Sequence, residues 1–221
     1  MTSHKRKTAL LIAVVIVVAA AVIVGVRVYS KLNSPFAWKY KKEIAAVIED
    51  RQLESIEFDR ITGSGDGYTL HFALNGSKVS EAGLRDAVSA LNAVSKLGED
   101  SAFPLYQKDI TIKAMEDNEP SEGMLTLLLC SDSGLLKVSI TNSTVQDLSC
   151  LNNTECSALE LTVVHDEMFD PERLFEIKSI AKLSVTDCYD ISRDAHKRIT
   201  LDEELTARLK EKYPGIVIEN S

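Results

Sequence analysis

The sequence lacks the short motifs that mark the common catalytic and ligand-binding sites. It contains no Walker phosphate-binding pattern, no H-E-x-x-H zinc motif, no EF-hand loop, no G-x-S-x-G motif and no C-x-x-C pair. Carboxylates are common throughout a chain this acidic, so neighbouring pairs of them single out no general acid or base. We therefore predict that the protein is not an enzyme, and we predict no catalytic, cofactor-binding or metal-binding residues and no cofactor.

Basic residues are scarce beyond the N-terminus. Residues 33–221 contain 20 lysines and arginines against 33 aspartates and glutamates, a net charge of −13. An acidic surface without a basic stripe repels the phosphates of nucleic acids and of anionic lipids. Nucleic acid is therefore excluded as an expected partner. These 189 residues are enough for one domain with a substantial core or for two small domains.

A long apolar run occurs once, near the N-terminus. Ala9–Val26 are eighteen consecutive apolar or glycine residues. As a helix they would be roughly 27 Å long, close to the ~30 Å hydrocarbon core of a bilayer. We predict a basic tail at residues 1–7, a transmembrane anchor at 8–28 and a juxtamembrane linker at 29–33. The alternative is a long signal peptide cut near Ser30, although no A-x-A-like cleavage site follows the run.

Basic residues flank the predicted anchor on both sides. They are Lys5, Arg6 and Lys7 before it, and Arg27, Lys31, Lys39, Lys41 and Lys42 after it. Their number alone favours a cytoplasmic C-terminal domain, but a short basic tail is hard to translocate and the later residues suit the headgroup level. We predict a single-pass protein of the cell membrane with a cytoplasmic N-terminus and an extracytoplasmic C-terminal domain.

The predicted domain contains four cysteines, Cys130, Cys150, Cys156 and Cys188. Outside the cytoplasm they permit two disulfides in three connectivities, and Cys150 and Cys156 are near enough in sequence to close a small loop. The alternative is that Cys130 and Cys188, which end apolar runs, pack as free thiols. N-x-S/T patterns stand at Asn75, Asn142 and Asn152, and they matter only in a host that glycosylates proteins.

Residues 34–132 predict an α+β region in the order helix, hairpin, helix, hairpin. Apolar residues recur at helical spacing in Ser34–Asp50 and in Ser80–Leu97. Alternating patterns predict strands at 55–61, 68–74, 109–115 and 124–130. We expect these strands to form an antiparallel sheet with the helices on one face.

Three alternate glycines lie between the first two predicted strands, in residues 62–67. A phosphate-binding loop needs a helix after it, whereas a strand follows here. We therefore predict a hairpin turn at Asp66-Gly67.

Residues 133–221 predict parallel strands that alternate with helices. An L-x-x-L-x-L frame recurs, matched by Leu135, Val138 and Ile140, by Cys156, Leu159 and Leu161, by Ile180, Leu183 and Val185, and by Tyr213, Ile216 and Ile218. Helical segments are indicated between these frames, one beginning at Asp170-Pro171 and one at Leu201–Leu209. Cys188 follows the third frame at the place where a leucine-rich repeat has asparagine or cysteine.

On these residues, a region of about 85 residues resembles the leucine-rich repeats. The resemblance implies a concave strand face that binds protein. An ordinary parallel sheet of βαβ units produces the same alternation, so both architectures stay open. The predicted fold class is α/β, with an α+β first half and strand–helix repeats in the second half, behind one N-terminal transmembrane helix.

One candidate ligand cluster contains a histidine. His165, Asp166, Glu167 and Asp170 follow a predicted strand, and ligand sites in α/β proteins lie at the carboxyl ends of parallel strands. His196 could join them only if the fold brings it near. A metal site usually has a second histidine or cysteine at defined spacing, so a solvated acidic loop is the preferred interpretation.

The sequence thus predicts a membrane-anchored protein, held in the bilayer by residues 8–28, whose acidic domain binds or scaffolds another macromolecule. We expect a protein partner at the cell surface. One alternative is a membrane-tethered enzyme with a site near His165, which would show a concave pocket with convergent polar groups. Another is a stem or assembly subunit, which would show an apolar patch on the helix at Phe36–Ile48.

Overall fold

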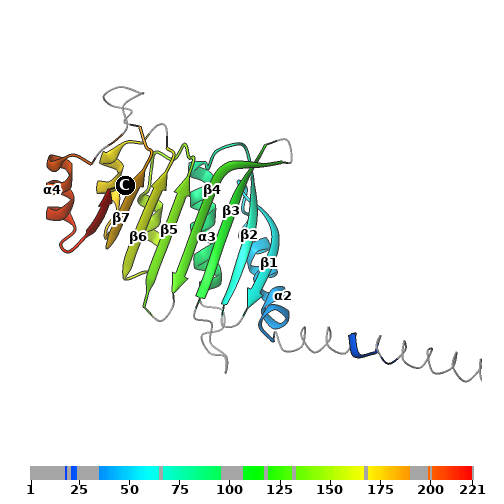
Figure 1. The fold of residues 1–221 in the computed structure, drawn as a ribbon. Helices are drawn as coiled ribbons and strands as arrows, with labels where there is room; N and C mark the ends of the chain where they lie inside the picture. Colours follow the sequence, from blue (N-terminus) through cyan, green and yellow to red (C-terminus); the bar gives the residue numbers. More distant parts are fainter. Residues whose placement is uncertain are drawn as a thin grey trace, which may run out of the picture.

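The computed structural model describes residues 18, 21–23, 35–64, 67–95, 107–116, 119–130, 133–166, 169–189, 199 and 201–220. Its elements are α2 (Pro35–Asp50), β1 (Glu57–Ser64), β2 (Gly67–Asn75), α3 (Glu81–Ser95), β3 (Gln107–Glu116), β4 (Glu119–Cys130), β5 (Leu135–Thr141), η1 (Ser149–Asn153), β6 (Ala158–Val164), η2 (Pro171–Glu176), β7 (Lys182–Thr186), α4 (Glu203–Lys212) and β8 (Val217–Asn220). Figure 1 shows the strands as one broad layer with helices along one side. The fold is mixed α/β, as the sequence predicts at this level.

The eight strands form one sheet in which the spatial order is the chain order, from β1 to β8. The pairs β1–β2, β3–β4 and β4–β5 are antiparallel, whereas β2–β3 and all pairs from β5 to β8 are parallel. The prediction that the strands of residues 34–132 form an antiparallel sheet is therefore wrong for one pair, β2–β3. A helix lies between β2 and β3 and returns the chain to the other end of the sheet, so β3 runs in the direction of β2.

The predicted elements of the first half are all present, with shifted ends. The Ser80 Oγ accepts a hydrogen bond from the Gly83 backbone N–H at 3.1 Å, which caps α3. The β3–β4 hairpin is longer than predicted, because Glu116 pairs with Glu119. Residues 119–123, which lie between the predicted strands 109–115 and 124–130, belong to β4. The predicted regions 34–132 and 133–221 share one sheet, since β4 pairs directly with β5.

The glycine-rich segment forms the predicted β1–β2 hairpin. Ser64 pairs with Gly67, which leaves only residues 65–66 between the two strands. The turn therefore lies one residue earlier than Asp66-Gly67, because Gly67 is already the first residue of β2. No helix follows this segment, so it lacks the context of a phosphate-binding loop.

Strands β5 to β8 provide the predicted parallel units, connected through η1, η2 and α4. In the register of these strands, Leu161 lies opposite Val138 on one side and opposite Leu183 on the other, and Leu183 lies opposite Ile218. The second and fourth predicted frames, 156–161 and 213–218, are therefore displaced by two residues from the true alignment. Because strand patterns repeat every two residues, a shift of two leaves the apolar pattern unchanged.

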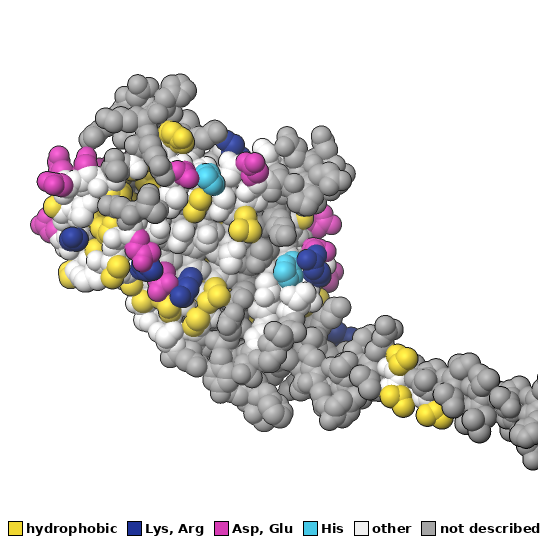
Figure 2. Space-filling model, viewed as in Figure 1, with side chains coloured by type: hydrophobic (Ala, Val, Ile, Leu, Met, Phe, Trp, Pro, Cys, Tyr) yellow, Lys and Arg dark blue, Asp and Glu magenta, His cyan; other side chains and the backbone are white. Residues whose placement is uncertain are grey.

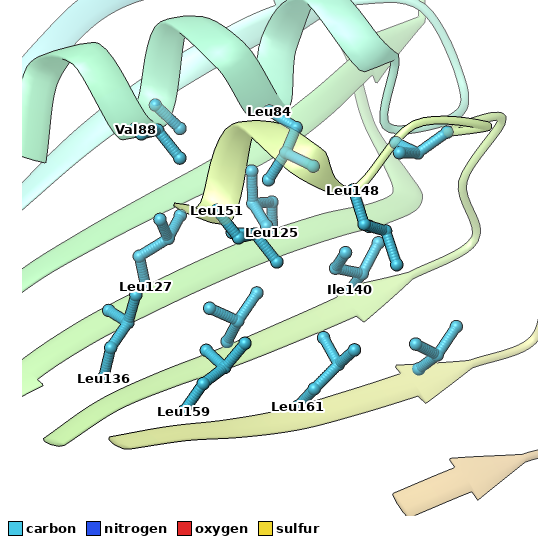
Figure 3. Packing of buried hydrophobic residues seen from close by; sticks show 14 of the residues in the cluster. Leu84, Val88, Leu125, Leu127, Leu136, Ile140, Leu148, Leu151, Leu159 and Leu161 are labelled. Carbon is cyan, nitrogen blue, oxygen red and sulfur yellow. The ribbon is translucent and has the colours of Figure 1, made fainter. Parts of the chain in front are cut away.

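One face of the sheet builds the hydrophobic core with the helices. Alternate residues are buried in β2, β5, β6 and β7, as in the regular alternation from Ala158 to Val164 in β6. Figure 3 shows strand residues such as Leu125, Leu136 and Leu161 directed toward Leu84 of α3 and toward the η1 segment. The residues that alternate with them form the opposite surface, here called the open face. Among the described residues, no helix covers the open face (Figure 1).

The predicted anchor lies almost wholly outside the described residues. Within it, Val18 and residues 21–23 are helical, and Val18, Val22 and Ile23 expose more than half of their surface. A search of the described helices finds none that is both long enough and apolar enough to cross a bilayer. The tail at 1–7 and the linker at 29–33 also lie outside the described residues, so the anchor stays a prediction.

All four cysteines are free thiols, so the structure contains neither of the two permitted disulfides. Cys188 is fully buried and packs as a small apolar side chain, as the alternative interpretation predicts. The Cys156 Sγ lies 3.2 Å from the Thr154 Oγ1.

Burial of two thiols and one tyrosine hydroxyl makes the stability of the fold depend on pH in the alkaline range. Desolvation raises the pKa of the Cys150 and Cys188 thiols from 9.0 to about 11, and that of Tyr213 from 10.0 to about 12. The folded chain therefore holds these protons more tightly than the unfolded chain. The stability that these groups contribute is fully present below about pH 9 and is lost as the pH rises through about 11.

We expect the thermal unfolding midpoint of the full chain to fall across this alkaline range. The variant Cys188→Ala removes one of the responsible protons, so its midpoint should fall less steeply with pH. Calorimetry of both proteins over the same pH series measures the difference, and identical slopes would contradict this account.

Candidate functional site

The described residues of the predicted cluster after β6 lie in different surroundings. His165 is exposed and Asp166 is buried. The Asp170 carboxylate accepts a hydrogen bond from the Glu172 backbone N–H at 3.0 Å and so caps η2. Glu167 and His196 lie outside the described residues. In the described part of the chain, no group of three or more histidine, cysteine or acidic side chains is arranged to hold a metal ion.

Asp166 belongs to a buried polar cluster. Its Oδ2 accepts hydrogen bonds from the Ser143 Oγ at 2.9 Å and from the Arg173 Nη2 at 2.7 Å. The Asp166 and Arg173 side chains are only 1% and 3% exposed. The Arg173 guanidinium carbon also lies 4.5 Å from the centroid of the Phe169 ring. The ion pair connects η2 to the end of β6, and the Ser143 hydrogen bond connects the same carboxylate to the end of β5. The carboxylate therefore has a structural role.

Ser143, Asp166 and Cys188 occupy equivalent positions in three successive units. The register places Val164 opposite Thr141 and opposite Thr186, and each of the three buried residues stands two positions later. Sequence analysis recognised only Cys188 at this position. The signal in the sequence was their spacing, 23 residues from Ser143 to Asp166 and 22 from Asp166 to Cys188. The second predicted frame, 156–161, was displaced by two residues, so this spacing was not recognised.

Each of these three buried residues is preceded by a residue at the carboxyl end of a strand, and the preceding residues form a row across β5, β6 and β7. Asn142, His165 and Asp187 have φ angles of 51°, 50° and 53°. Asparagine, aspartate and histidine are the non-glycine residues that most readily adopt this left-handed backbone. The turn places the residue after each of them in the core and leaves the three side chains along one rim of the open face.

These three side chains line a cleft of about 870 Å³, here called the rim cleft. The remaining lining residues are Thr141, Tyr189, Lys78 and Glu122. The His165 Nδ1 lies 3.8 Å from the Asp187 Oδ2, which is longer than a hydrogen bond. Of the predicted cluster, only His165 lines the cleft. Its neighbours come from distant segments, so no local spacing could have revealed them.

Backbone hydrogen bonds fix the loop that carries Lys78. The Val79 N–H donates to the Asn142 carbonyl at 3.0 Å, and the Thr144 N–H donates to the Val79 carbonyl at 2.8 Å. The Gly123 N–H donates to the Ser77 carbonyl at 3.1 Å. The loop between β2 and α3 is thus held against β4 and the end of β5, and the rim cleft is largely preformed.

Rows of side chains cross the strands of the open face beside the rim cleft. One row consists of hydroxyl residues at paired positions, Thr126, Ser139, Thr162 and Ser184. The next row, at Lys137, Glu160 and Lys182, alternates in charge, whereas Glu219 lies opposite Ser184 of the hydroxyl row. The Lys137 Nζ lies 3.1 Å from the Glu160 carboxylate, and the Lys182 Nζ lies 2.8 Å from the Glu219 carboxylate.

The described charged side chains of the open face are of both signs. They include Arg60, Lys137, Lys182, Glu57, Glu160 and Glu219, and the Asp59 carboxylate forms an ion pair with Arg60. Figure 2, which views this face, shows basic, acidic and apolar side chains scattered among the described residues.

The Asn152 side chain joins two neighbouring units on the helical side. Its Nδ2 donates to the Glu176 carbonyl at 2.9 Å, and its Oδ1 accepts from the Lys178 N–H at 2.7 Å. We expect Asn152→Ala to reduce the free energy of unfolding by about 1–3 kcal/mol, because both backbone groups lose their partner. Urea unfolding measures this loss. The adjacent variant Asn153→Ala is the control and should change stability by less than about 0.5 kcal/mol; equal losses would contradict the bridging role.

Comparisons with known proteins assign no family. No protein-family model matches the chain, and no curated protein matches it. A solved structure with similarity to it is that of the Legionella pneumophila effector protein RavZ, residues 20–502. The TM-score is 0.31 at 11% sequence identity, over 65% of this chain and 43% of that one. The chain thus spans less than half the length of that protein, and so low a score carries no argument about fold or function.

Proposed function

We propose that this chain is a single-pass membrane protein whose acidic extracytoplasmic domain binds a protein partner through the open face of its sheet. The observation that carries this proposal is the one-sided packing of the described helices. They cover a single face of an eight-stranded sheet, and the other face presents its side chains to solvent.

The composition of the open face suits a protein partner. Protein interfaces combine apolar contacts with hydrogen bonds and avoid unpaired charge. The open face offers hydroxyl rows and charge pairs, together with apolar side chains such as Met124, which is 39% exposed, and Val217, which is 54% exposed.

The likeness of residues 133–221 to leucine-rich repeats supports the same proposal. Four parallel strands lie in consecutive register, and Ser143, Asp166 and Cys188 fill one repeated buried position. The resemblance implies that the strand face is the binding face. The eighteen-residue apolar run supports the membrane anchor, and the short basic tail before it, which is hard to translocate, supports the proposed orientation.

The two alternative functions have less support. An enzyme near His165 would need a partner that orients the imidazole, and the 3.8 Å distance to Asp187 is too long for that hydrogen bond. A stem subunit would expose the apolar stripe of α2, yet Ile44 and Ile48 are buried against the domain.

Site-specific photo-crosslinking in native membranes tests the binding face. A photoreactive residue at Thr162, on the open face, should give a discrete crosslinked product. The matched control at Lys210, exposed on α4, should give none. Adding Ser139→Glu and Ser184→Glu should abolish the Thr162 product, because two unpaired carboxylates then enter the contact. Products of equal yield from both positions would contradict the proposal.

Protease treatment of intact cells tests the orientation separately. Digestion of the domain from outside supports an extracytoplasmic position. Protection of the domain, together with digestion after permeabilisation, would show a cytoplasmic domain and overturn the proposed topology.

A further inference from the structure

We propose that the rim cleft is a binding site for a neutral, polyhydroxylated ligand, which is a carbohydrate by chemical class. It lies at the carboxyl ends of β5, β6 and β7, at the border of the open face. The proposal does not depend on the protein partner or on the membrane anchor.

The size and construction of the rim cleft suit a small ligand. Its volume of about 870 Å³ falls in the range of ordinary ligand sites. Its lining converges from the β2–α3 loop, the start of β4 and the ends of three parallel strands. Because backbone hydrogen bonds hold Val79 to Asn142 and Thr144, these segments meet without a ligand to order them.

The charges of the site disfavour other classes of ligand. The lining contains one lysine, Lys78, and two acidic residues, Glu122 and Asp187, and the whole domain carries a net charge of −13. An anionic ligand would therefore be repelled. A metal ion lacks its ligand set among the described side chains.

The donors and acceptors of the lining match sugar hydroxyl groups. Carboxylates only accept hydrogen bonds and an ammonium group only donates them, whereas the Asn142 amide and the Tyr189 hydroxyl do both. A sugar hydroxyl also does both, and a vicinal diol offers two donors to the two oxygens of one carboxylate. The 3.8 Å separation of His165 Nδ1 and Asp187 Oδ2 leaves room for one bridging hydroxyl.

The backbone of the rim gives independent support. Glycine would adopt the left-handed conformation at 142, 165 and 187 without strain. Each position instead has a side chain with planar hydrogen-bonding groups, and all three line the same cleft. The left-handed backbone favours these residue types, and it leaves their hydrogen-bonding groups at the cleft, where a ligand can contact them.

Histidine-labelled full-length protein allows a direct test by NMR. The probes are maltose, lactose and cellobiose, with glycylglycine as a zwitterionic probe and inorganic phosphate as an anionic probe. The imidazole signal of His165, assigned with His165→Gln, should shift on addition of at least one sugar. His71 is the internal control, because it lies on β2 next to Thr62 and away from the cleft, and its signal should not move.

Two variants separate ligand binding from structural effects. Asp187→Asn keeps a residue that tolerates the left-handed backbone and should weaken sugar binding about tenfold. Lys182→Ala, on the open face away from the rim, should leave sugar binding unchanged. The proposal is overturned if none of the three sugars shifts His165, if glycylglycine or phosphate shifts it instead, or if Asp187→Asn binds the sugars as the parent chain does.

Discussion

Replacing Asp166 with alanine should reduce the free energy of unfolding by about 3–5 kcal/mol. The change leaves the Arg173 guanidinium buried without its ion-pair partner, and it removes the acceptor of the Ser143 hydroxyl. Among the described residues, the Arg173 Nε already has no hydrogen-bond partner, so little remains to compensate the charge. Urea unfolding of the full chain in mild detergent, followed by circular dichroism, measures the loss.

Two further variants identify the cause of this loss. Asp166→Asn keeps the shape of the side chain and one acceptor but removes the negative charge. Its free energy of unfolding should therefore lie between those of the parent and of Asp166→Ala. Lys137→Ala breaks an exposed ion pair with Glu160 and should cost less than about 1 kcal/mol. If Asp166→Ala cost no more than Lys137→Ala, the buried cluster would not be a structural anchor.

Replacing Leu125 with alanine should reduce the free energy of unfolding by about 2–5 kcal/mol. Leu125 is fully buried in β4, and Figure 3 shows it between the sheet and α3. Removing three carbon atoms there loses apolar contacts and leaves a cavity, because side chains from the helix and from neighbouring strands cannot all move into it.

The adjacent residue supplies the control for this prediction. Thr126 points to the open face, and Thr126→Ala should change stability by no more than about 0.5 kcal/mol. The same unfolding measurement applies to both variants. Similar losses at the two positions would mean that the open face is packed against something in the folded chain, and the proposed binding surface would then be wrong.

Local patterns in the sequence were sufficient to predict the elements of the first half. Ser80 caps α3, and apolar residues at helical and strand spacing identify both helices and both hairpins. Strand direction was not predictable in the same way. The parallel pairing of β2 with β3 depends on how α3 packs across the sheet, which is a tertiary contact rather than a property of either strand.

The candidate site was less accessible to sequence reasoning. His165 was recognised because it follows a strand, but Lys78 and Glu122 approach it only through the folding of the sheet. Asp166 resembled a possible ligand, since nothing in its local sequence indicates that Arg173 neutralises it in the core. The sequence does not distinguish an acidic residue that is ion-paired in the core from one that could bind a ligand, because the difference depends on its partners in the fold.

The chain-order arrangement of the strands has a consequence for how the protein is made. Each strand pairs only with segments that were synthesised just before or just after it. The sheet can therefore grow from β1 while the ribosome is still producing later strands, without waiting for a distant partner. At every stage the newest strand is a temporary unpaired edge. Among the described strands that edge is β8, whose four residues offer little length for pairing with another molecule.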